Sequence, residues 1–180
     1  MPRFTAKPGA MALGAHIIAT VEALGAYAAT GYRILAEHGI TDIKPDEWYP
    51  MQAFCSFFEA LDRRVGASVF YIVGKAVACA VPLPPEVNNV EKALSRFDLV
   101  YKTYYKGVAW TEGWKVQIRG DQSAKLVFRG PFPDDFVRGL AEGFIRRFAR
   151  GSKSQITVRI DAAAPRRDRG QSSTTLLASW

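Results

Sequence analysis

The spacing of apolar residues changes once along this chain, and that change limits the folds open to it. Up to about residue 107, apolar side chains recur every three to four positions, which is typical of helices. Beyond that point, stretches appear in which apolar and polar residues alternate, which is typical of strands with one buried face. The sequence therefore predicts an α+β fold that begins with helices and continues into a sheet.

The first half contains several helical patterns separated by glycine or proline. The 69–80 segment is apolar nearly all round apart from Lys75, so we expect it to be buried in the middle of the fold. Gly39 and Gly66 each stand where a helix should end. The helices are expected over about 13–24, 27–38, 50–65, 69–80 and 85–106.

The second half predicts an antiparallel sheet of four to five strands with one covering helix. Residues 114–118 and 124–128 alternate on either side of Gly120-Asp121, a pair suited to a hairpin turn with glycine first. Asp134 is a natural N-cap for a helix over 134–150, and 156–160 and 176–180 alternate again. Because strands with one apolar face need a helical layer, we expect the 134–150 helix to cover the sheet.

Length and composition indicate one domain over 1–180, with residues 1–10 flexible. The longest apolar runs fall short of the roughly 20 residues that span a bilayer. The N-terminal stretch reads as a helix and not as a signal peptide. Cys55 and Cys79 are interpreted as free thiols in a reducing compartment, so we expect a cytoplasmic protein.

Positive charge is concentrated in the last quarter of the chain. From Arg138 onward there are nine basic and three acidic residues, against a net charge of +7 for the whole chain. This pattern indicates an acidic partner, an anionic ligand or a solubilising surface. The candidate anion-binding residues are Arg159, Arg166, Arg167 and Arg169. Nucleic acid is not expected as a partner, because no aromatic residue lies among the arginines of 162–175.

No group of residues has the composition of a catalytic or metal centre. His16 is interpreted as a buried, hydrogen-bonded core residue, and His38 as a last-turn residue that interacts with the helix dipole. Neither histidine has a nucleophile near it in the sequence. Two widely separated cysteines and two histidines do not form a zinc pattern. We therefore expect no enzyme activity and no metal.

A set of landmarks in the chain resembles a known group of domains. They are Trp48-Tyr49-Pro50, the helix that contains 69–75, the Tyr104–Gly107 helix end before the Trp114 strand, and the 130–136 segment. Over about 41–180 these resemble vinyl-reductase-type and haem-NO-binding-like domains, which are related to TRAPP subunits, and in particular their bacterial branch. The resemblance implies helices packed on an antiparallel sheet, a small-molecule pocket between the layers, and a role as a sensor, a tetrapyrrole accessory factor or an interaction scaffold.

The same resemblance bears on cofactors. The haem-NO-binding relatives use a proximal histidine and a Tyr-x-Ser-x-Arg motif, and the vinyl-reductase-type members carry cysteines near the C-terminal end. This chain has no such motif and no cysteine after Cys79, and neither His16 nor His38 lies in a comparable context. We therefore expect no cofactor, and no haem in particular.

The aromatic residues around the helix-to-hairpin junction carry the functional expectation. Lys75 could neutralise an acidic ligand, with Tyr71 one turn earlier on the same face, although a surface lysine would explain it too. The expected function is a non-enzymatic, sensor-like domain that binds a hydrophobic or weakly anionic small molecule. A homodimer is expected. The alternative is a protein–protein interaction adaptor without ligand, either a homodimer or bound to another partner. The candidate ligand-binding residues are Phe57, Phe70, Tyr71, Val73, Lys75, Tyr101, Tyr104 and Trp114.

Overall fold

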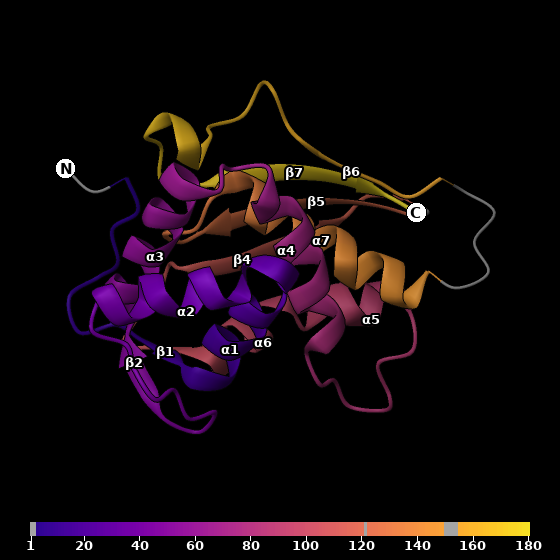
Figure 1. The fold of residues 1–180 in the computed structure, drawn as a ribbon. Coiled ribbons are helices and arrows are strands. Elements are labelled where there is room, and N and C mark those ends of the chain that lie inside the picture. Colours follow the sequence, from indigo (N-terminus) through magenta and orange to yellow (C-terminus); the bar gives the residue numbers. More distant parts are fainter. Residues whose placement is uncertain (1–2, 121, 150–154) are drawn as a thin grey trace.

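Helices and two antiparallel sheets make up the fold, which Figure 1 shows from the helical side. The structure is a computed structural model, and it describes residues 3–120, 122–149 and 155–180. The helices are α1 (Gly14–Glu22), α2 (Ala28–Glu37), α3 (Met51–Arg64), α4 (Val69–Ala80), α5 (Val90–Ser95), α6 (Phe97–Tyr104) and α7 (Asp134–Phe148). Short 3-10 turns lie at Gly25–Tyr27 and Arg167–Arg169.

The larger sheet has four antiparallel strands in the order β4-β5-β7-β6. These are β4 (Gly113–Ile118), β5 (Ser123–Arg129), β6 (Thr157–Ile160) and β7 (Thr174–Ser179). On the inner face, Trp114 lies opposite Phe128, and Leu126 lies opposite Leu176. The predicted α+β class and the predicted strands are therefore confirmed. Gly120, at the start of the hairpin turn, has a φ of +59°, which favours glycine; Asp121 lies outside the described residues.

A smaller sheet, which the apolar pattern does not predict, joins distant parts of the chain. Its order is β2-β1-β3, with β1 (Met11–Leu13), β2 (Trp48–Pro50) and β3 (Tyr105–Lys106). Strands of two or three residues are too short to show a period of two. The expected start of one helix at Pro50 and the expected end of another at Lys106 are therefore wrong, because Pro50 lies in β2 and Lys106 in β3. The single helix predicted over 85–106 is also divided into α5 and α6, and it begins only at Val90, where the Asn89 side chain caps the Lys92 N–H.

The N-terminal segment packs against the helical layer. A flexible end is expected over 1–10, whereas the Phe4 side chain is fully buried and its N–H donates to Glu59 at 2.8 Å. The Ala6 N–H donates to Gln52 at 2.9 Å. Residues 3–10 therefore form part of the packed structure. Among the described residues, no helix has the length and apolar character needed to cross a membrane.

The pair α4 and α7 lies side by side in front of the larger sheet (Figure 1). The two backbones approach closely because glycines face each other across the contact. A Cβ added to Gly74 would come within 2.2 Å of the Phe136 carbonyl oxygen, and one added to Gly139 within 2.2 Å of the Tyr71 oxygen. Neither backbone oxygen can move away without shifting its helix, so these two positions require glycine.

The first turn of α7 differs from the N-cap expected at Asp134. The Asp134 side chain is fully buried, and its carboxylate accepts from the Thr174 hydroxyl and, at 3.0 Å, from Arg166 Nε. Asp134 therefore ties α7 to β7 and to the loop before it, and it does not cap its own helix.

Replacing Gly74 by Ala should destabilise the protein by about 2 kcal/mol or more, because the overpacking exceeds the gain in helix propensity. The measurement is urea denaturation followed by circular dichroism. Ala76→Ser, which adds one atom on the exposed side of the same helix, should change stability by less than about 0.5 kcal/mol. An equal, small effect of both substitutions would show that the helices are not held at this distance.

Candidate functional site

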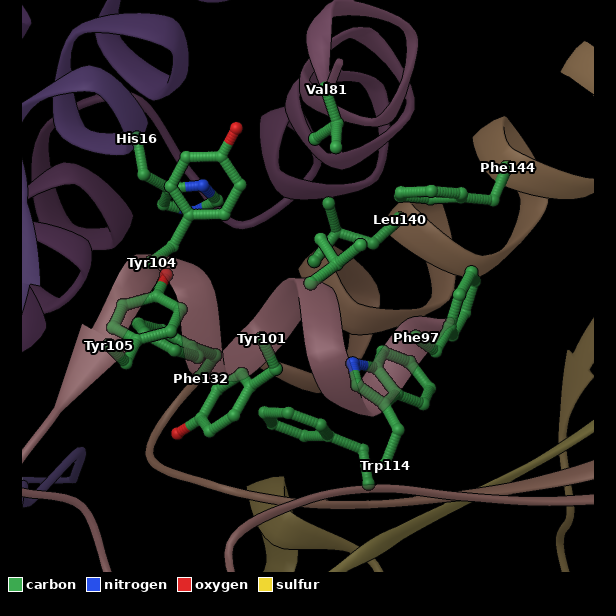
Figure 2. A pocket seen from close by; sticks show the side chains of 12 residues that line it. His16, Val81, Phe97, Tyr101, Tyr104, Tyr105, Trp114, Phe132, Leu140 and Phe144 are labelled. Atoms are coloured by element: carbon green, nitrogen blue, oxygen red, sulfur yellow. The ribbon is translucent and has the colours of Figure 1, made fainter. Parts of the chain in front are cut away.

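An aromatic pocket lies where α1, α6 and α7 meet the β4–β5 hairpin (Figure 2). The volume open to the centre of a water molecule is about 40 Å³, which is room for a few waters. Figure 2 shows His16 and Tyr104 on one side of this space and Leu140, Phe97 and Phe144 on the other. The lining residues are His16, Val81, Phe97, Val100, Tyr101, Tyr104, Tyr105, Trp114, Phe128, Phe132, Leu140 and Phe144.

The inner wall of the pocket is a set of rings in mutual edge-to-face or tilted contact. The Phe97 ring lies 4.9 Å from Trp114 and 4.6 Å from Phe144, and Trp114 lies 4.9 Å from Phe128. Such contacts between buried rings favour one arrangement of the wall. The partly exposed lining residues are Val100, Tyr104 and Leu140, so these form the mouth of the pocket.

His16 contributes the fully buried polar atom of the lining that has no hydrogen-bond partner among the described residues. Its side chain projects from α1 into the pocket and is buried, and its Nε2 makes no hydrogen bond with any described residue. The Tyr104 and Tyr105 rings lie 5.2 and 5.3 Å from the imidazole. Burial lowers the pKa of His16 to about 4, so the imidazole is neutral at neutral pH. A neutral imidazole can serve as a metal ligand or as a hydrogen-bond partner for a bound molecule.

The tyrosines of the lining keep their protons. Burial, together with the nearby Glu112 carboxylate, raises the pKa of Tyr101, and its hydroxyl donates to Glu112 at 3.2 Å. Burial likewise raises the pKa of Tyr105. The Tyr101 hydroxyl points away from the centre of the pocket in Figure 2. The interior is therefore apolar apart from the imidazole and the neutral hydroxyls at its margin.

The structure brings together only part of the predicted ligand-binding set. Tyr101, Tyr104 and Trp114 line the pocket. Phe57, Phe70, and Val73 are buried in the core of α3 and α4 and do not line it. His16 was missed, since its apolar helix suggested a hydrogen-bonded core residue. The sequence around His16 carries no signal for an unpartnered imidazole. Thr20, one turn later, donates its hydroxyl to the His16 carbonyl oxygen and not to the ring.

Tyr71 and Lys75 lie outside the pocket, in an ion cluster between α4 and α7. The Tyr71 hydroxyl and Lys75 Nζ, the latter at 3.2 Å, contact the carboxylate of Glu142, which also accepts from Arg146 Nε at 2.7 Å. Burial opposes ionisation of Glu142, but hydrogen bonds from Tyr71, Arg146 and Lys75 outweigh it and lower its pKa. The acid that Lys75 neutralises is therefore a residue of the chain itself.

The predicted anion-binding arginines do not converge on one point. Arg166 pairs with buried Asp134, and Arg167 Nε donates to the Gly130 carbonyl oxygen at 3.1 Å. Arg159 lies on β6, and Arg169 is exposed and makes no ion pair within the described residues. Arg167 also lines an open cleft of about 680 Å³ together with other residues, among them Arg3, Glu112, Arg129 and Asp168.

Comparison with solved structures identifies the fold. An H-NOX protein from S. oneidensis in the Fe(II)NO ligation state is similar with a TM-score of 0.68 and 14% identity, over 93% of this chain and 98% of that one. A structure from work on haem distortion in the H-NOX family gives a TM-score of 0.65 and 17% identity, over 93% and 94% of the two chains. An oxygen-binding H-NOX domain related to soluble guanylate cyclases gives 0.58 and 16%, over 91% and 90%. No protein-family model and no curated protein matches the sequence.

These comparisons confirm one part of the sequence-based resemblance and correct another. The chain has the fold of haem-NO-binding domains, whereas the vinyl-reductase and TRAPP parts of the resemblance have no support. The expectation of no cofactor and no haem is contradicted, because the domains that share this fold over nearly their whole length are described as haem proteins.

The pocket satisfies the chemical requirements of a haem in part. A neutral imidazole with an unpartnered nitrogen suits the role of an iron ligand, and apolar ring walls suit packing against the face of a porphyrin. The open volume does not hold a porphyrin, since sites for ligands of that size measure roughly 300–1,000 Å³. A haem therefore fits only if side chains of the lining move apart.

The buried imidazole should make stability depend on pH. The unfolded chain binds a proton at His16 near pH 6.5, whereas the folded chain does so near pH 4. The contribution of the neutral imidazole to the free energy of unfolding is therefore fully present above about pH 6.5 and falls as the pH drops toward 4. At pH 4.5 the free energy of unfolding is lower by about 2–3 kcal/mol. Urea denaturation at pH 7.5 and 4.5 measures this loss. In His16→Phe the free energy of unfolding should fall less between the two pH values, because the contribution of His16 is absent. Equal losses in both proteins would contradict the assignment.

Replacing Arg166 by Ala should cost about 2–3 kcal/mol of stability, because it leaves the buried Asp134 carboxylate without its cation. The matched control is Arg169→Ala, which removes an exposed arginine three residues away and should cost less than about 0.5 kcal/mol. Thermal denaturation compares the two variants. Similar melting temperatures would show that Arg166 is available for an external anion.

Proposed function

We propose that this chain is a ligand-binding, sensor-like domain whose ligand occupies the aromatic pocket, and that the ligand is a haem held with His16 facing it. The observation that carries the proposal is the imidazole of His16, which is buried in the lining with Nε2 unpartnered among the described residues. A buried polar group without a partner costs free energy, commonly about 1–3 kcal/mol. A ligand that forms a hydrogen bond with this nitrogen, or that carries a metal ion to which the nitrogen binds, would remove that cost.

The H-NOX fold supports the choice of haem. The similar structures are described by Fe(II)NO ligation, by haem redox potential and by an oxygen complex. When bound, a haem iron would supply the position at which such a diatomic gas attaches. This chain's own residues would supply a nitrogen donor, His16, the ring walls of Phe97, Trp114 and Phe144, and a water-excluding surround.

Entry of so large a ligand requires the mouth to open. Tyr104 and Leu140 are partly exposed, and they lie on opposite sides of the space in Figure 2. Rotation of exposed side chains is fast and inexpensive compared with displacement of the buried rings. The mouth therefore limits which ligands enter, and the inner wall and His16 decide how they are held.

Sensing, rather than turnover, suits this lining. The tyrosine hydroxyls are protonated and the imidazole is neutral but unpaired with any nucleophile or acid in the described residues. Nucleophilic catalysis requires a nucleophile within hydrogen-bonding reach of its base. We therefore propose that the domain binds its ligand and reports its presence.

Titration of the purified protein with haemin, followed by the Soret absorbance, tests the proposal. Binding should be saturable and one-to-one, and His16→Phe should weaken it by more than about tenfold, since even outer-shell partners of a metal ligand contribute that much. The matched control is His38→Phe, which changes a histidine at the end of α2, away from the pocket, and should leave binding unchanged.

A substitution at the mouth of the pocket provides a second test. Tyr104→Ala should speed haemin uptake, because it removes the largest partly exposed side chain of the lining. Stopped-flow absorbance measures the rate. Absence of saturable haemin binding to the original chain and to Tyr104→Ala alike would refute haem as the ligand, and native mass spectrometry of the purified protein would then show whether a smaller molecule occupies the pocket.

A further inference from the structure

A basic surface lies on the side of the larger sheet that faces away from the helices. Side chains alternate along each strand, so Trp114, Phe128 and Leu176 point to the core and their neighbours point outward. Four of the outward positions carry cations, and we name them together the basic face: Lys115, Lys125, Arg129 and Arg159. No Asp or Glu occupies an outward position within the four strands as described.

The cations of the basic face are unpaired, in contrast with many on the helical side. Lys75, Arg138, Arg146 and Arg166 each pair with a carboxylate of the chain. None of the four residues of the basic face makes an ion pair or hydrogen bond with another described residue through its side chain. Their charge is therefore available to a partner.

The centre of the basic face is aliphatic. Leu177 on β7 lies opposite Lys125 on one side and Arg159 on the other, and Val127 lies opposite Lys115. Both Leu177 and Val127 are only partly buried. A hollow of about 360 Å³ lies beside Leu177, lined by Thr157, Arg159, Leu177, Ala178 and Ser179. An apolar centre within a charged rim is the usual composition of a protein–protein interface.

We propose that the basic face docks an acidic partner protein, whose carboxylates pair with Lys115, Lys125 and Arg159 while an aliphatic side chain enters the hollow beside Leu177. The charge pattern selects this occupant, because a surface with cations and no carboxylates in its strands attracts a negative surface and repels a second copy of itself. Strands neighbour each other at about 4.8 Å, so Lys125 and Arg159 stand two strand spacings apart, on either side of Leu177.

Other anionic partners lack the features that they would use. Single-stranded nucleic acid binds to aromatic side chains on a sheet, and every ring of these strands points inward. A membrane surface is held by apolar side chains that enter it, whereas Val127 and Leu177 are recessed between longer basic side chains. The proposal is independent of what the pocket binds.

A charge-reversal pair tests the basic face. Lys125→Glu/Arg159→Glu is compared with Arg33→Glu/Arg63→Glu, which makes the same change in net charge at exposed positions of α2 and α3. The probe is a fluorescent poly-L-glutamate, with binding followed by anisotropy at low and physiological salt. The first variant should bind about tenfold more weakly or worse, and the second should keep most of its affinity. Haemin binding and thermal stability should be unchanged in both, which separates this test from that of the pocket.

Three results would overturn the proposal. Equal losses in the two variants would show attraction to net charge and not to this face, and no binding by the original chain would show that the face holds no acidic polypeptide. Tighter binding of oligothymidylate, or of vesicles made of equal parts phosphatidylglycerol and phosphatidylcholine, through the same two residues would assign the face to nucleic acid or to a membrane.

Discussion

The close contact between α4 and α7 is the constraint on which the rest of the structure depends. Gly74 and Gly139 bring the two backbones together at a distance that no side chain permits. Because α7 lies against both α4 and the larger sheet, that contact sets the thickness of the helical layer. It also places Leu140 and Phe144 in the wall of the pocket. A change in the spacing of these helices would alter the pocket before it altered any other site.

Two buried carboxylates hold α7 in place. Asp134, at the start of the helix, is bound by Thr174 and Arg166, and Glu142, two turns later, by side chains of α4 and by Arg146. Buried charge is tolerated when it is paired and hydrogen-bonded in this way. Tyr71, Lys75 and Arg166, which the sequence suggested as ligand-binding groups, therefore bind carboxylates of the protein itself and hold its elements together.

His16 differs from these groups because its Nε2 has no hydrogen-bond partner among the described residues. Folding has removed the imidazole from water and has depressed its pKa to about 4 without providing a hydrogen bond. Elsewhere in the described chain, one oxygen of Asp168, which lies beside an open cleft, is also buried without a hydrogen-bond partner. Structures generally satisfy their buried polar groups, so an exception inside a ring-lined pocket is what distinguishes this site from ordinary core.

The apolar period by itself determined the α+β class, the four strands of the larger sheet and the covering helix α7 (Asp134–Phe148), because a period of 3.6 or 2 records which face of an element is buried. It could not show what that face is buried against. Only the tertiary structure decided that Lys75 meets Glu142, that Phe57 packs in the core and that His16 faces a cavity. Short strands such as Trp48–Pro50 also required it, since their hydrogen bonds come from residues more than thirty positions away. Period is local, whereas partners and cavities arise from contacts between distant segments.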